Sequence, residues 1–350
     1  MTFPLPLPMS LQLTRTQLTS IADAFGFPHV SPAELLPVGG GYSGAGIWKW
    51  ESHNPPYALR RWPQNTLPKS RLLGLHRLLR WWGDNGFPEF AIPLPTTDGS
   101  TLLQLDSHLW QMEPWMPGRA DFHAHPSEDR LKSAMHWLAR LHLATPRFLP
   151  DPAAREWFQS FPASPSPAVS ERLSLIHSWN PERIAAHRSQ IPRIPDQRFH
   201  TPLLGFLDQF PRHAPGIATE LQLATRLSVP LFPSLRDLWH DHLLFTGEQL
   251  SAVIDPAHCR TESAPSDLSR LLGSLFPLEK NSWDRALEFY TSLRPLTPDE
   301  YQLLEVLDRS QILLSGLHWV ERLTTDSPLP SDPTSLANRL ETLHKRLDTL

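Results

Sequence analysis

The sequence lacks the features that would place the protein in a membrane or outside the cell. Cys259 is its single cysteine, so no intramolecular disulfide can form, and this fits a reducing compartment such as the cytoplasm. No apolar run approaches the roughly 18 residues of a membrane-spanning helix. The segment Met1–Pro8 alternates proline with apolar residues and has no basic start typical of a secretory signal. We therefore expect a cytoplasmic protein without a membrane partner.

The chain also lacks an excess of one charge. Its 32 Lys and Arg residues nearly balance 36 Asp and Glu residues, which gives a formal net charge of -4. Because nucleic acids are bound through clustered positive charge, we expect no nucleic-acid partner. Hydrophobic residues make up 40% of the 350 residues, enough for one large domain or two ordinary ones. The 38 prolines lie mostly between periodic segments, where they are expected to stiffen loops and end helices.

The first part of the chain has the pattern of a small antiparallel sheet. Apolar spacing predicts a leading helix within residues 10–25 and a second helix over 70–82. The capping-box spacing of Ser31 to Glu34 predicts a further helix start. The remaining strand-like runs, bounded by turn residues, are 47–51, 57–62, 102–105 and 109–112.

The composition changes after residue 112. Two prolines and a glycine make residues 113–118 a connector. An amphipathic helix is predicted over 127–145, and the Pro-rich stretch 146–233 contains helical patches at 170–178 and 217–227. Thr297 to Glu300 is a second capping box and opens a helix to about Trp319. The short heptad seam after Leu336 is expected to dock onto its own chain, with a dimer through this C-terminal helix as the alternative.

A glycine-rich cluster precedes the strand at 47–51. Residues 39–44 satisfy G-x-G-x-x-G, but no helix follows as a dinucleotide-binding unit would require. A nucleophile elbow around the serine is excluded because Ala45 replaces its last glycine. A glycine loop between strands can lay its amides over nucleotide phosphates, and a plain hairpin turn is the alternative. The candidate phosphate-binding residues are Gly39, Gly40, Gly41, Ser43 and Gly44.

Arg60 follows this cluster on the strand-like run 57–62. A cation there could pair with nucleotide phosphates, and a guanidinium offers a bidentate fork that lysine lacks. The alternative is an edge-strand arginine exposed to solvent.

The segment from Ser234 to Asp267 carries the strongest chemical signal. A polar loop containing Asp237 leads into a short apolar strand, a turn, and a second apolar strand that ends at Asp255. Such a hairpin places both carboxylates at the same end, where one can orient an acceptor hydroxyl and the other can hold Mg²⁺. Carboxylates also serve as caps and turn residues, so the spacing alone leaves a structural role open.

The same segment resembles the aminoglycoside phosphotransferase and choline kinase group, small-molecule relatives of the protein kinases. The family's catalytic loop reads H-G-D-x-x-x-x-N, and Arg236-Asp237 and His242 occupy its glycine-aspartate and asparagine positions. Ile254-Asp255 matches the element that supplies the metal-binding aspartate. Asp267-Leu268 falls at the D-L-A element that buttresses the loop, and residues 137–142 look like the L-A-x-L-H helix end.

The resemblance implies an α+β, two-lobed protein-kinase-like fold. Its small antiparallel N-lobe would comprise residues 1–112 and bind the nucleotide, and residues 113–118 would form the hinge. The larger, mainly helical C-lobe would comprise residues 119–350 and include the Pro-rich insertion.

The resemblance also implies ATP as the phosphoryl donor and a small molecule as the acceptor. Asp237 would be the catalytic aspartate, with Arg236 recreating the R-D pair of protein kinases. Asp255 would bind Mg²⁺, and the backbone groups of Glu113 and Trp115 would meet adenine.

Several residues depart from the family pattern. His242 stands at the position of the metal-binding asparagine, and because imidazole suits softer metals, Mn²⁺ is an alternative to Mg²⁺. Arg60 replaces the strand lysine, and the helix at 70–82 has His76 near the place of the partnering glutamate. We expect a phosphotransferase acting on a hydroxyl, with a weakly active or inactive nucleotide-binding regulatory protein as the alternative.

Two further possibilities rest on residue type. The cluster His240, Asp241, His242, His258 and Cys259, with His123-x-His125, could bind zinc, but no third ligand lies at a diagnostic spacing. Acidic residues on the later helices could face a cationic substrate, although a solvated helix face is favoured. These residues are Asp284, Glu288 and Asp308.

Overall fold

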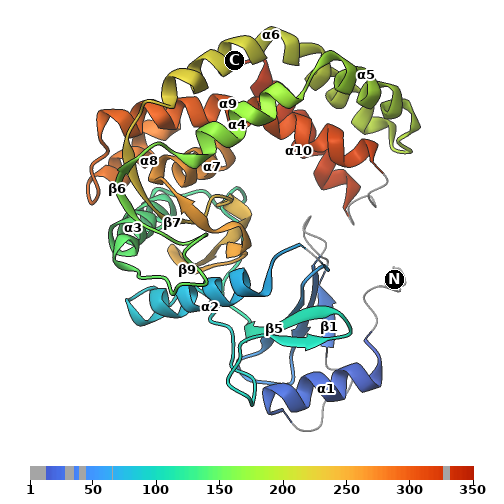
Figure 1. Cartoon of the computed structure of the whole chain (residues 1–350), viewed down its shortest axis with the longest axis vertical. Coiled ribbons are helices and arrows are strands. Elements are labelled where there is room, and N and C mark those ends of the chain that lie inside the picture. Colours follow the sequence, from blue (N-terminus) through green and yellow to red (C-terminus); the bar gives the residue numbers. More distant parts are fainter. Residues whose placement is uncertain (1–12, 28–34, 39–44, 65, 326–331) are drawn as a thin grey trace. The chain divides into compact units, whose positions relative to one another are not determined.

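The chain forms two compact units. The computed structural model describes residues 13–27, 35–38, 45–64, 66–325 and 332–350 (Figure 1). The smaller unit comprises residues 1–118, 150–155 and 251–254. The larger unit comprises residues 119–149, 156–250 and 255–350.

The smaller unit is an antiparallel sheet with helices. Its sheet has the order β1-β2-β3-β5-β4, and α2 lies between β3 and β4 in the sequence, as predicted. The helix predicted after Ser31 is wrong at its described part, because residues 35–38 pair with β2 as a strand. The elements are α1 (Arg15–Phe25), β1 (Leu35–Val38), β2 (Gly46–Trp50), β3 (Tyr57–Arg61), α2 (Lys69–Asp84), β4 (Leu103–Leu105) and β5 (His108–Pro114).

Alternation along β2 explains the core of this unit. Trp48 and Trp50 point to one face and are 2% exposed, while Lys49 between them points to the other. On the buried face they join the apolar side of α1, including Ile21, and Trp110 of β5. These tryptophans therefore serve packing.

The larger unit is mainly helical. It has a three-stranded sheet of order β10-β7-β6, and β8 pairs with β9, which begins in this unit. Its helices are α3 (Glu128–Ala144), α4 (Pro167–Ser178), α5 (Pro181–Gln190), α6 (His200–Ala224), α7 (Ala264–Leu275), α8 (Asn281–Thr291), α9 (Pro298–Thr324) and α10 (Pro333–Leu347). The strands are β6 (Phe161–Ser164), β7 (Val229–Ser234), β8 (Leu243–Thr246), β9 (Gln249–Val253) and β10 (Arg260–Glu262). Short 3-10 turns cover Thr145–Arg147, Ile191–Arg193, Gln197–Phe199, His240–His242 and Pro256–His258.

Proline does not end every helix in this unit. The helix α6 continues through Pro211 and Pro215, although proline normally interrupts the helical hydrogen bonds. The helix buries a continuous apolar face, including Phe206 and Leu221, and packs against α9. Tertiary burial therefore overrides the local preference that the sequence suggested. By contrast, the capping box at Thr297 is confirmed, since it opens α9.

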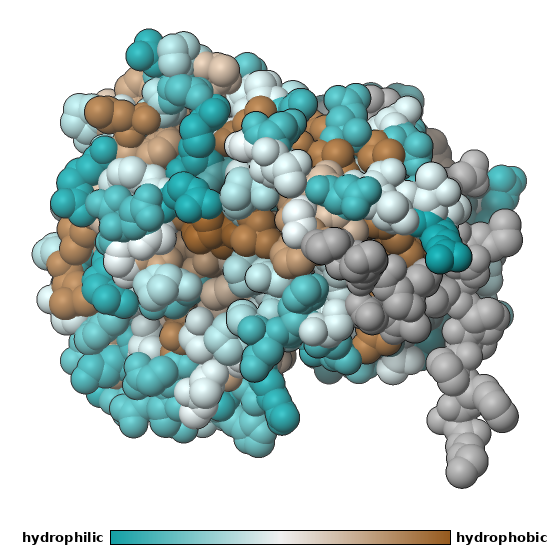
Figure 2. Space-filling view, turned by 90° about the horizontal axis from the view of Figure 1, so that it is seen from below, coloured by the Kyte–Doolittle hydropathy of each residue, from teal (hydrophilic) through white to brown (hydrophobic). Residues whose placement is uncertain are grey.

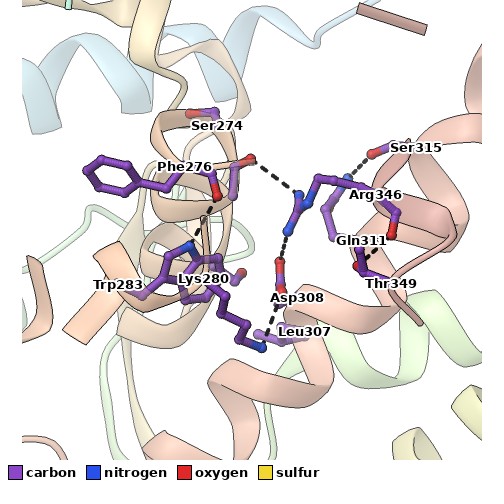
Figure 3. A network of polar contacts seen from close by, with 12 residues as sticks. Ser274, Phe276, Lys280, Trp283, Leu307, Asp308, Gln311, Ser315, Arg346 and Thr349 are labelled. Atoms are coloured by element: carbon purple, nitrogen blue, oxygen red, sulfur yellow. Dashed lines mark hydrogen bonds and ion pairs between the residues drawn. The ribbon is translucent and has the colours of Figure 1, made fainter. Parts of the chain in front are cut away.

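The C-terminal helix docks onto its own chain, as the seam predicted. Its heptad leucines are buried where α10 packs against α6 and α9. Figure 3 shows the polar contacts that accompany this packing, with Arg346 of α10 donating to Asp308 of α9 at 2.6 Å. Arg346 also donates to the carbonyl of Gly273 on α7 at 3.3 Å. The buried leucines are Leu336, Leu340, Leu343 and Leu347.

The surface is mixed in polarity. On the face shown in Figure 2, hydrophobic residues form small groups between hydrophilic ones, consistent with a mean hydropathy of -0.32. Among the helices that the structure describes, none is both long enough and apolar enough to cross a membrane.

Candidate active site

A tight turn after β7 presents Asp237. The amide of Asp237 donates to the carbonyl of Leu235 at 2.8 Å, and Arg236 between them has φ 63, in the left-handed region. A non-glycine residue costs of order 1 kcal/mol in this conformation, which glycine would adopt without that cost. The Arg236 side chain forms an ion pair with Glu171.

Asp267, in the first turn of α7, anchors this loop. Its carboxylate is fully buried and accepts the amides of Leu235 at 3.0 Å and of Arg236 at 2.5 Å. His142, near the end of α3, lies 3.1 Å from the same carboxylate through Nε2 and 2.7 Å from the Tyr290 hydroxyl through Nδ1. Burial lowers the pKa of His142 despite its contact with Asp267. The neutral ring therefore donates from Nε2 and accepts at Nδ1, because the carboxylate can only accept.

The two oxygens of the Asp237 carboxylate differ in their surroundings. Oδ1 accepts from the indole Nε1 of Trp239 at 2.8 Å and from Nε of Arg270 at 2.9 Å, and the Arg270 NH2 group lies 2.8 Å away. Among the described residues, none donates a hydrogen bond to Oδ2. The side chain is 30% exposed. One oxygen is thus fixed while the other can meet a ligand.

The charge state of Asp237 follows from these contacts. Burial alone would raise the pKa of its carboxyl, but the Arg270 guanidinium and the nearby His242 and His258 hold that pKa well below its usual range. The carboxylate therefore stays ionised at neutral pH and can accept a proton only at a strong cost. In a reaction, this carboxylate would therefore act mainly by holding a substrate group in position and less by accepting a proton.

Arg270 was not found by sequence reasoning. It lies three residues after Asp267 on α7, so both side chains project from the same face of the helix toward the loop. This spacing is the signal that could have identified it. Its partner Asp237 is 33 residues away in the sequence, however, and only the packing of α7 shows that the two side chains meet.

His242 and Asp255 are the predicted metal ligands. Nδ1 of His242 donates to the backbone carbonyl of Asp237 at 2.9 Å, which leaves the lone pair on Nε2. In metal sites, a backbone carbonyl that accepts from the other ring nitrogen orients a metal-binding histidine in the same way. Asp255 is half-buried, has φ 56 and begins the 3-10 turn at Pro256.

These residues fit a metal ion only if the substrate supplies the other ligands. Within the described part of the chain, no three His, Cys, Asp or Glu side chains form a group that could hold a metal ion. The zinc cluster considered from the sequence therefore does not assemble, and Cys259 is fully buried. Mg²⁺ is commonly held by one or two carboxylates together with substrate phosphates and water, and the Asp255 carboxylate meets that requirement.

In the smaller unit, Arg60 is buried and has an acidic neighbour. Its NH2 group lies 4.0 Å from Oε1 of Glu113 on β5, and the arginine is only 8% exposed. The alternative of a solvent-exposed arginine is therefore wrong. On α2, His76 contacts the side chains of Gln111 and Thr101, and burial lowers its pKa to about 4. The acidic partner of Arg60 thus comes from the sheet instead of the helix.

The two residues expected to meet adenine lie at the end of β5. The amide of Trp115 donates to the carbonyl of Pro56 at 2.9 Å, so this amide is already hydrogen-bonded within the smaller unit. Glu113 pairs with Ala58 of β3 in the sheet. The predicted phosphate-binding glycines and Ser43 lie in residues 39–44, outside the described residues.

The acids considered for a cationic substrate have other roles or positions. Asp308 is 2% exposed and pairs with Arg346, so neither a substrate-facing nor a solvated position is correct for it. Asp284 and Glu288 on α8 are exposed, and Glu288 pairs with Arg285. The expectation of a solvated helix face is therefore confirmed for Asp284 and Glu288 on α8 and is wrong for Asp308 on α9.

Comparisons with known proteins agree with this geometry. Residues 34–331 match the sequence profile of the phosphotransferase enzyme family. No curated protein matches the chain by sequence.

Solved structures with the same fold have low sequence identity to this chain. The spectinomycin phosphotransferase solved with ADP and spectinomycin is 15% identical, with a TM-score of 0.62, over 96% of this chain and 94% of its own. The microcompartment-associated aminopropanol kinase is 15% identical, with a TM-score of 0.59, over 94% and 95%. The aminoglycoside phosphotransferase from Alicyclobacillus acidocaldarius is 17% identical, with a TM-score of 0.53, over 92% and 98%. These matches confirm the predicted kinase-like α+β fold.

Proposed function

The chain belongs to the phosphotransferase enzyme family, and from this premise we propose that it transfers the γ-phosphoryl group of ATP to a hydroxyl of a small molecule. The observation that supports this most directly is the Asp237 carboxylate. One of its oxygens is held by Trp239 and Arg270, and the loop that carries it is anchored by Asp267. A fixed carboxylate with one open oxygen is what phosphoryl transfer uses to orient an acceptor hydroxyl.

The proposed reaction needs little covalent chemistry from the protein. Oδ2 of Asp237 accepts the hydrogen bond of the acceptor hydroxyl and takes its proton as the oxygen attacks the γ-phosphorus. The bond from that phosphorus to the β–γ bridging oxygen breaks, and ADP leaves. Because the pKa of Asp237 is lowered, the proton is transferred late, and the carboxylate acts mainly by positioning the nucleophile. In this scheme the Arg236 backbone shapes the turn that presents Asp237.

A divalent cation is part of the proposal. When bound, Mg²⁺ or Mn²⁺ neutralises the negative charge that develops on the phosphates. The carboxylate of Asp255 would hold it, and Nε2 of His242 would favour Mn²⁺ over Mg²⁺ because imidazole is a softer ligand.

The nucleotide contacts are assigned to the N-terminal part of the chain. We assign residues 1–112 to a nucleotide-binding lobe, 113–118 to a hinge and 119–350 to the lobe that carries Asp237. Arg60 and the amides of residues 39–46 would hold the phosphates, and backbone groups of Glu113 and Trp115 would contact adenine. The single cysteine, which is buried, fits action in the cytoplasm.

A nucleotide-binding regulatory protein is the second candidate. The observation that favours it is that Glu113 lies next to Arg60. A carboxylate at this position would compete with a nucleotide phosphate for the guanidinium group of Arg60. Because burial lowers the pKa of His76 to about 4, this residue on α2 is neutral at pH 7. It therefore cannot orient Arg60 through an ion pair, as an acidic residue on α2 could.

Nucleotide binding and turnover separate these candidates. We expect ATP and ADP to raise the melting temperature in the presence of Mg²⁺ or Mn²⁺, and the enzyme to consume ATP with a small alcohol. Asp237→Asn should retain nucleotide binding and lower turnover by about 100-fold or more, within the range for loss of a general base. Asp241→Asn, an exposed acid in the same loop region, is the matched control and should keep its activity.

Each result has a distinct reading. Full turnover by the Asp237→Asn variant would remove this residue from the mechanism. Nucleotide binding without ATP consumption across a broad panel of alcohols would favour the regulatory protein. Failure to bind any nucleotide would contradict both candidates.

A further inference from the structure

A buried glutamine lies at the centre of a polar layer on one face of the smaller unit's sheet. Gln111 on β5 is 4% exposed, and its partner across the strand register on β3 is Arg60. Glu113 lies two residues further along β5 and projects from the same face, because side chains alternate along a strand. Trp110 and Met112 belong to the apolar core that the other face forms with α1. The sheet thus separates an apolar layer from a polar one.

The partners of Gln111 fix the direction in which its side-chain amide points. Nε1 of Trp62 lies 2.8 Å from Oε1 of Gln111, and an indole N–H can only donate. Nε2 of Gln111 lies 2.6 Å from Oε2 of Glu113, and a carboxylate can only accept. Exchanging the oxygen and nitrogen of the amide would break both hydrogen bonds. The amide oxygen therefore faces Trp62 and the amide nitrogen faces Glu113.

His76 of α2 extends this layer to the helix. Its Nε2 lies 3.0 Å from Oε1 of Gln111 and must donate to it, because that oxygen can only accept. Burial lowers the pKa of His76 to about 4, so the ring is neutral at pH 7 and Nδ1 carries a lone pair. This lone pair accepts from the hydroxyl of Thr101 at 2.7 Å. The hydrogen bonds from Thr101 through His76 and Gln111 to Glu113 therefore all run in one direction and form a relay.

The carboxylate at the end of this relay faces Arg60. Oε1 of Glu113 lies 4.0 Å from the NH2 group of Arg60, while Oε2 of the same carboxylate accepts from Gln111. The guanidinium carbon of Arg60 lies 5.1 Å from the ring centroid of Trp62. Gln111 thus holds two side chains that lie next to the guanidinium group, one through its amide nitrogen and one through its amide oxygen.

We propose that Glu113 orients Arg60 toward the nucleotide phosphates, and that Gln111 is a positioning residue that holds Glu113 for this task. This inference rests on the proposed phosphotransferase function and adds the residues that set the direction of its phosphate-binding cation. A guanidinium group carries five N–H donors, so it can bind a carboxylate and a phosphate together. His76 needs no charge in this arrangement, because it acts on Arg60 through Gln111 and Glu113.

The opposite role for Glu113 predicts the opposite result. A carboxylate that competes with phosphate for Arg60 weakens nucleotide binding, so removal of its charge raises the affinity for ATP. A carboxylate that orients Arg60 strengthens nucleotide binding, so removal of its charge lowers that affinity. The sign of the change in ATP affinity therefore distinguishes the two roles.

Glu113→Gln tests the orienting role. The new side chain keeps an oxygen for the amide of Gln111 and the same backbone, and it removes the charge. Affinities for ATP and for adenosine are measured with Mg²⁺ present, by displacement of a fluorescent ADP analogue. We expect the affinity for ATP to fall about tenfold, and the affinity for adenosine, which has no phosphate, to stay unchanged. Glu51→Gln removes an exposed acid from the same unit and should change neither affinity.

Gln111→Met tests the positioning role. Methionine has a similar length but offers no amide, so Glu113 loses its hydrogen bond, and the affinity for ATP alone should again fall about tenfold. In the double variant with Glu113→Gln, the loss should exceed that of Glu113→Gln by no more than about twofold, because Gln111 acts through Glu113. Gln104→Met, at an exposed position of β4, is the matched control. The melting temperature shows whether each variant is folded, and Gln111→Asn, whose shorter amide cannot reach both partners, replaces Gln111→Met if that variant does not fold.

Other outcomes overturn the inference. An affinity for ATP that is unchanged or higher in Glu113→Gln, or an equal loss for ATP and adenosine, would contradict the orienting role of Glu113. Fully additive losses in the double variant would contradict the action of Gln111 through Glu113. The wild-type protein is measured in the same experiment. If it does not bind ATP, the proposed function fails, whereas ATP binding that is insensitive to Glu113→Gln contradicts this inference alone.

Discussion

At the proposed catalytic aspartate, the two carboxylate oxygens have separate tasks. Oδ1 of Asp237 accepts from Trp239 and Arg270, and these bonds fix the direction in which Oδ2 points. The same arginine keeps the carboxyl ionised, because its positive charge stabilises the carboxylate relative to the acid. Arg270 is therefore a positioning residue that also sets the charge state of the group it holds.

Arg270→Gln should shift the pH dependence of turnover. A base acts only when it is deprotonated, and the arginine holds the pKa of Asp237 below its usual value. Without this charge the pKa rises, so the acid limb of kcat/KM moves to higher pH in the variant. Arg270→Lys keeps the charge and should leave the limb near its wild-type position. Superimposable limbs for wild type and Arg270→Gln would contradict this role.

At the scale of elements, α7 organises the loop. Asp267 and Arg270 lie one helical turn apart and contact different parts of the same loop, its backbone amides and the proposed catalytic carboxylate of Asp237. The position of α7 therefore determines both the turn at Arg236 and the orientation of Asp237. His142 of α3 and Tyr290 of α8 complete the buried polar chain behind Asp267.

Asp267→Asn should weaken both stability and turnover. An amide retains one acceptor oxygen but turns an N–H group toward a backbone amide, so one buried donor loses its partner. We expect a loss of about 3 kcal/mol in the free energy of unfolding, measured by urea denaturation. Asp284→Asn, on the exposed face of α8, is the control and should change it by less than about 0.5 kcal/mol. An Asp267→Asn variant as stable as this control would show that the hydrogen bonds of the Asp267 carboxylate do not stabilise the fold.

At the scale of the whole chain, the C-terminal helix is tied to the body of the larger unit. The ion pair of Arg346 and Asp308 is nearly solvent-free, and Lys280 lies 3.7 Å from the same carboxylate. Burial raises the pKa of Asp308 in spite of these cations. The same helix carries Arg339, whose guanidinium carbon lies 3.8 Å from the ring centroid of Trp239, so loss of this ion pair would also disturb that contact.

Arg346→Ala should be strongly destabilising at neutral pH, by about 3 kcal/mol, because it leaves the Asp308 carboxylate buried without its main partner. A raised pKa in the folded state means that the folded state binds a proton more readily than the unfolded one. The defect should therefore shrink as the pH falls and Asp308 becomes neutral. Unfolding in urea at pH 8 and pH 5 measures this difference. A defect that is constant over this range would contradict a charge-based cause.

Much of the local structure could be predicted from the sequence. The run 47–51 was predicted as a strand and lies in β2, and Thr297 marked the start of α9. The spacing from Asp237 to His242 and the Asp267-Leu268 pair identified the loop and its anchor. These signals succeed because helix caps, strand alternation and loop motifs depend on residues only a few positions apart.

Other features depend on contacts between distant segments. The helix predicted after Ser31 does not include residues 35–38, because these residues pair with β2 in the sheet. The helix α6 continues through two prolines because its apolar face packs against α9.

The segment from Ser234 to Asp267 by itself carried the resemblance to the phosphotransferases, because its motif lies within one short stretch of the sequence, and the family match agrees with that resemblance. Only the tertiary structure decided that Arg270 holds Asp237, that Glu113 lies near Arg60, and that Arg339 stacks on Trp239. Each of these pairs joins separate elements, and charged side chains meet across such distances only after the apolar faces of those elements have packed.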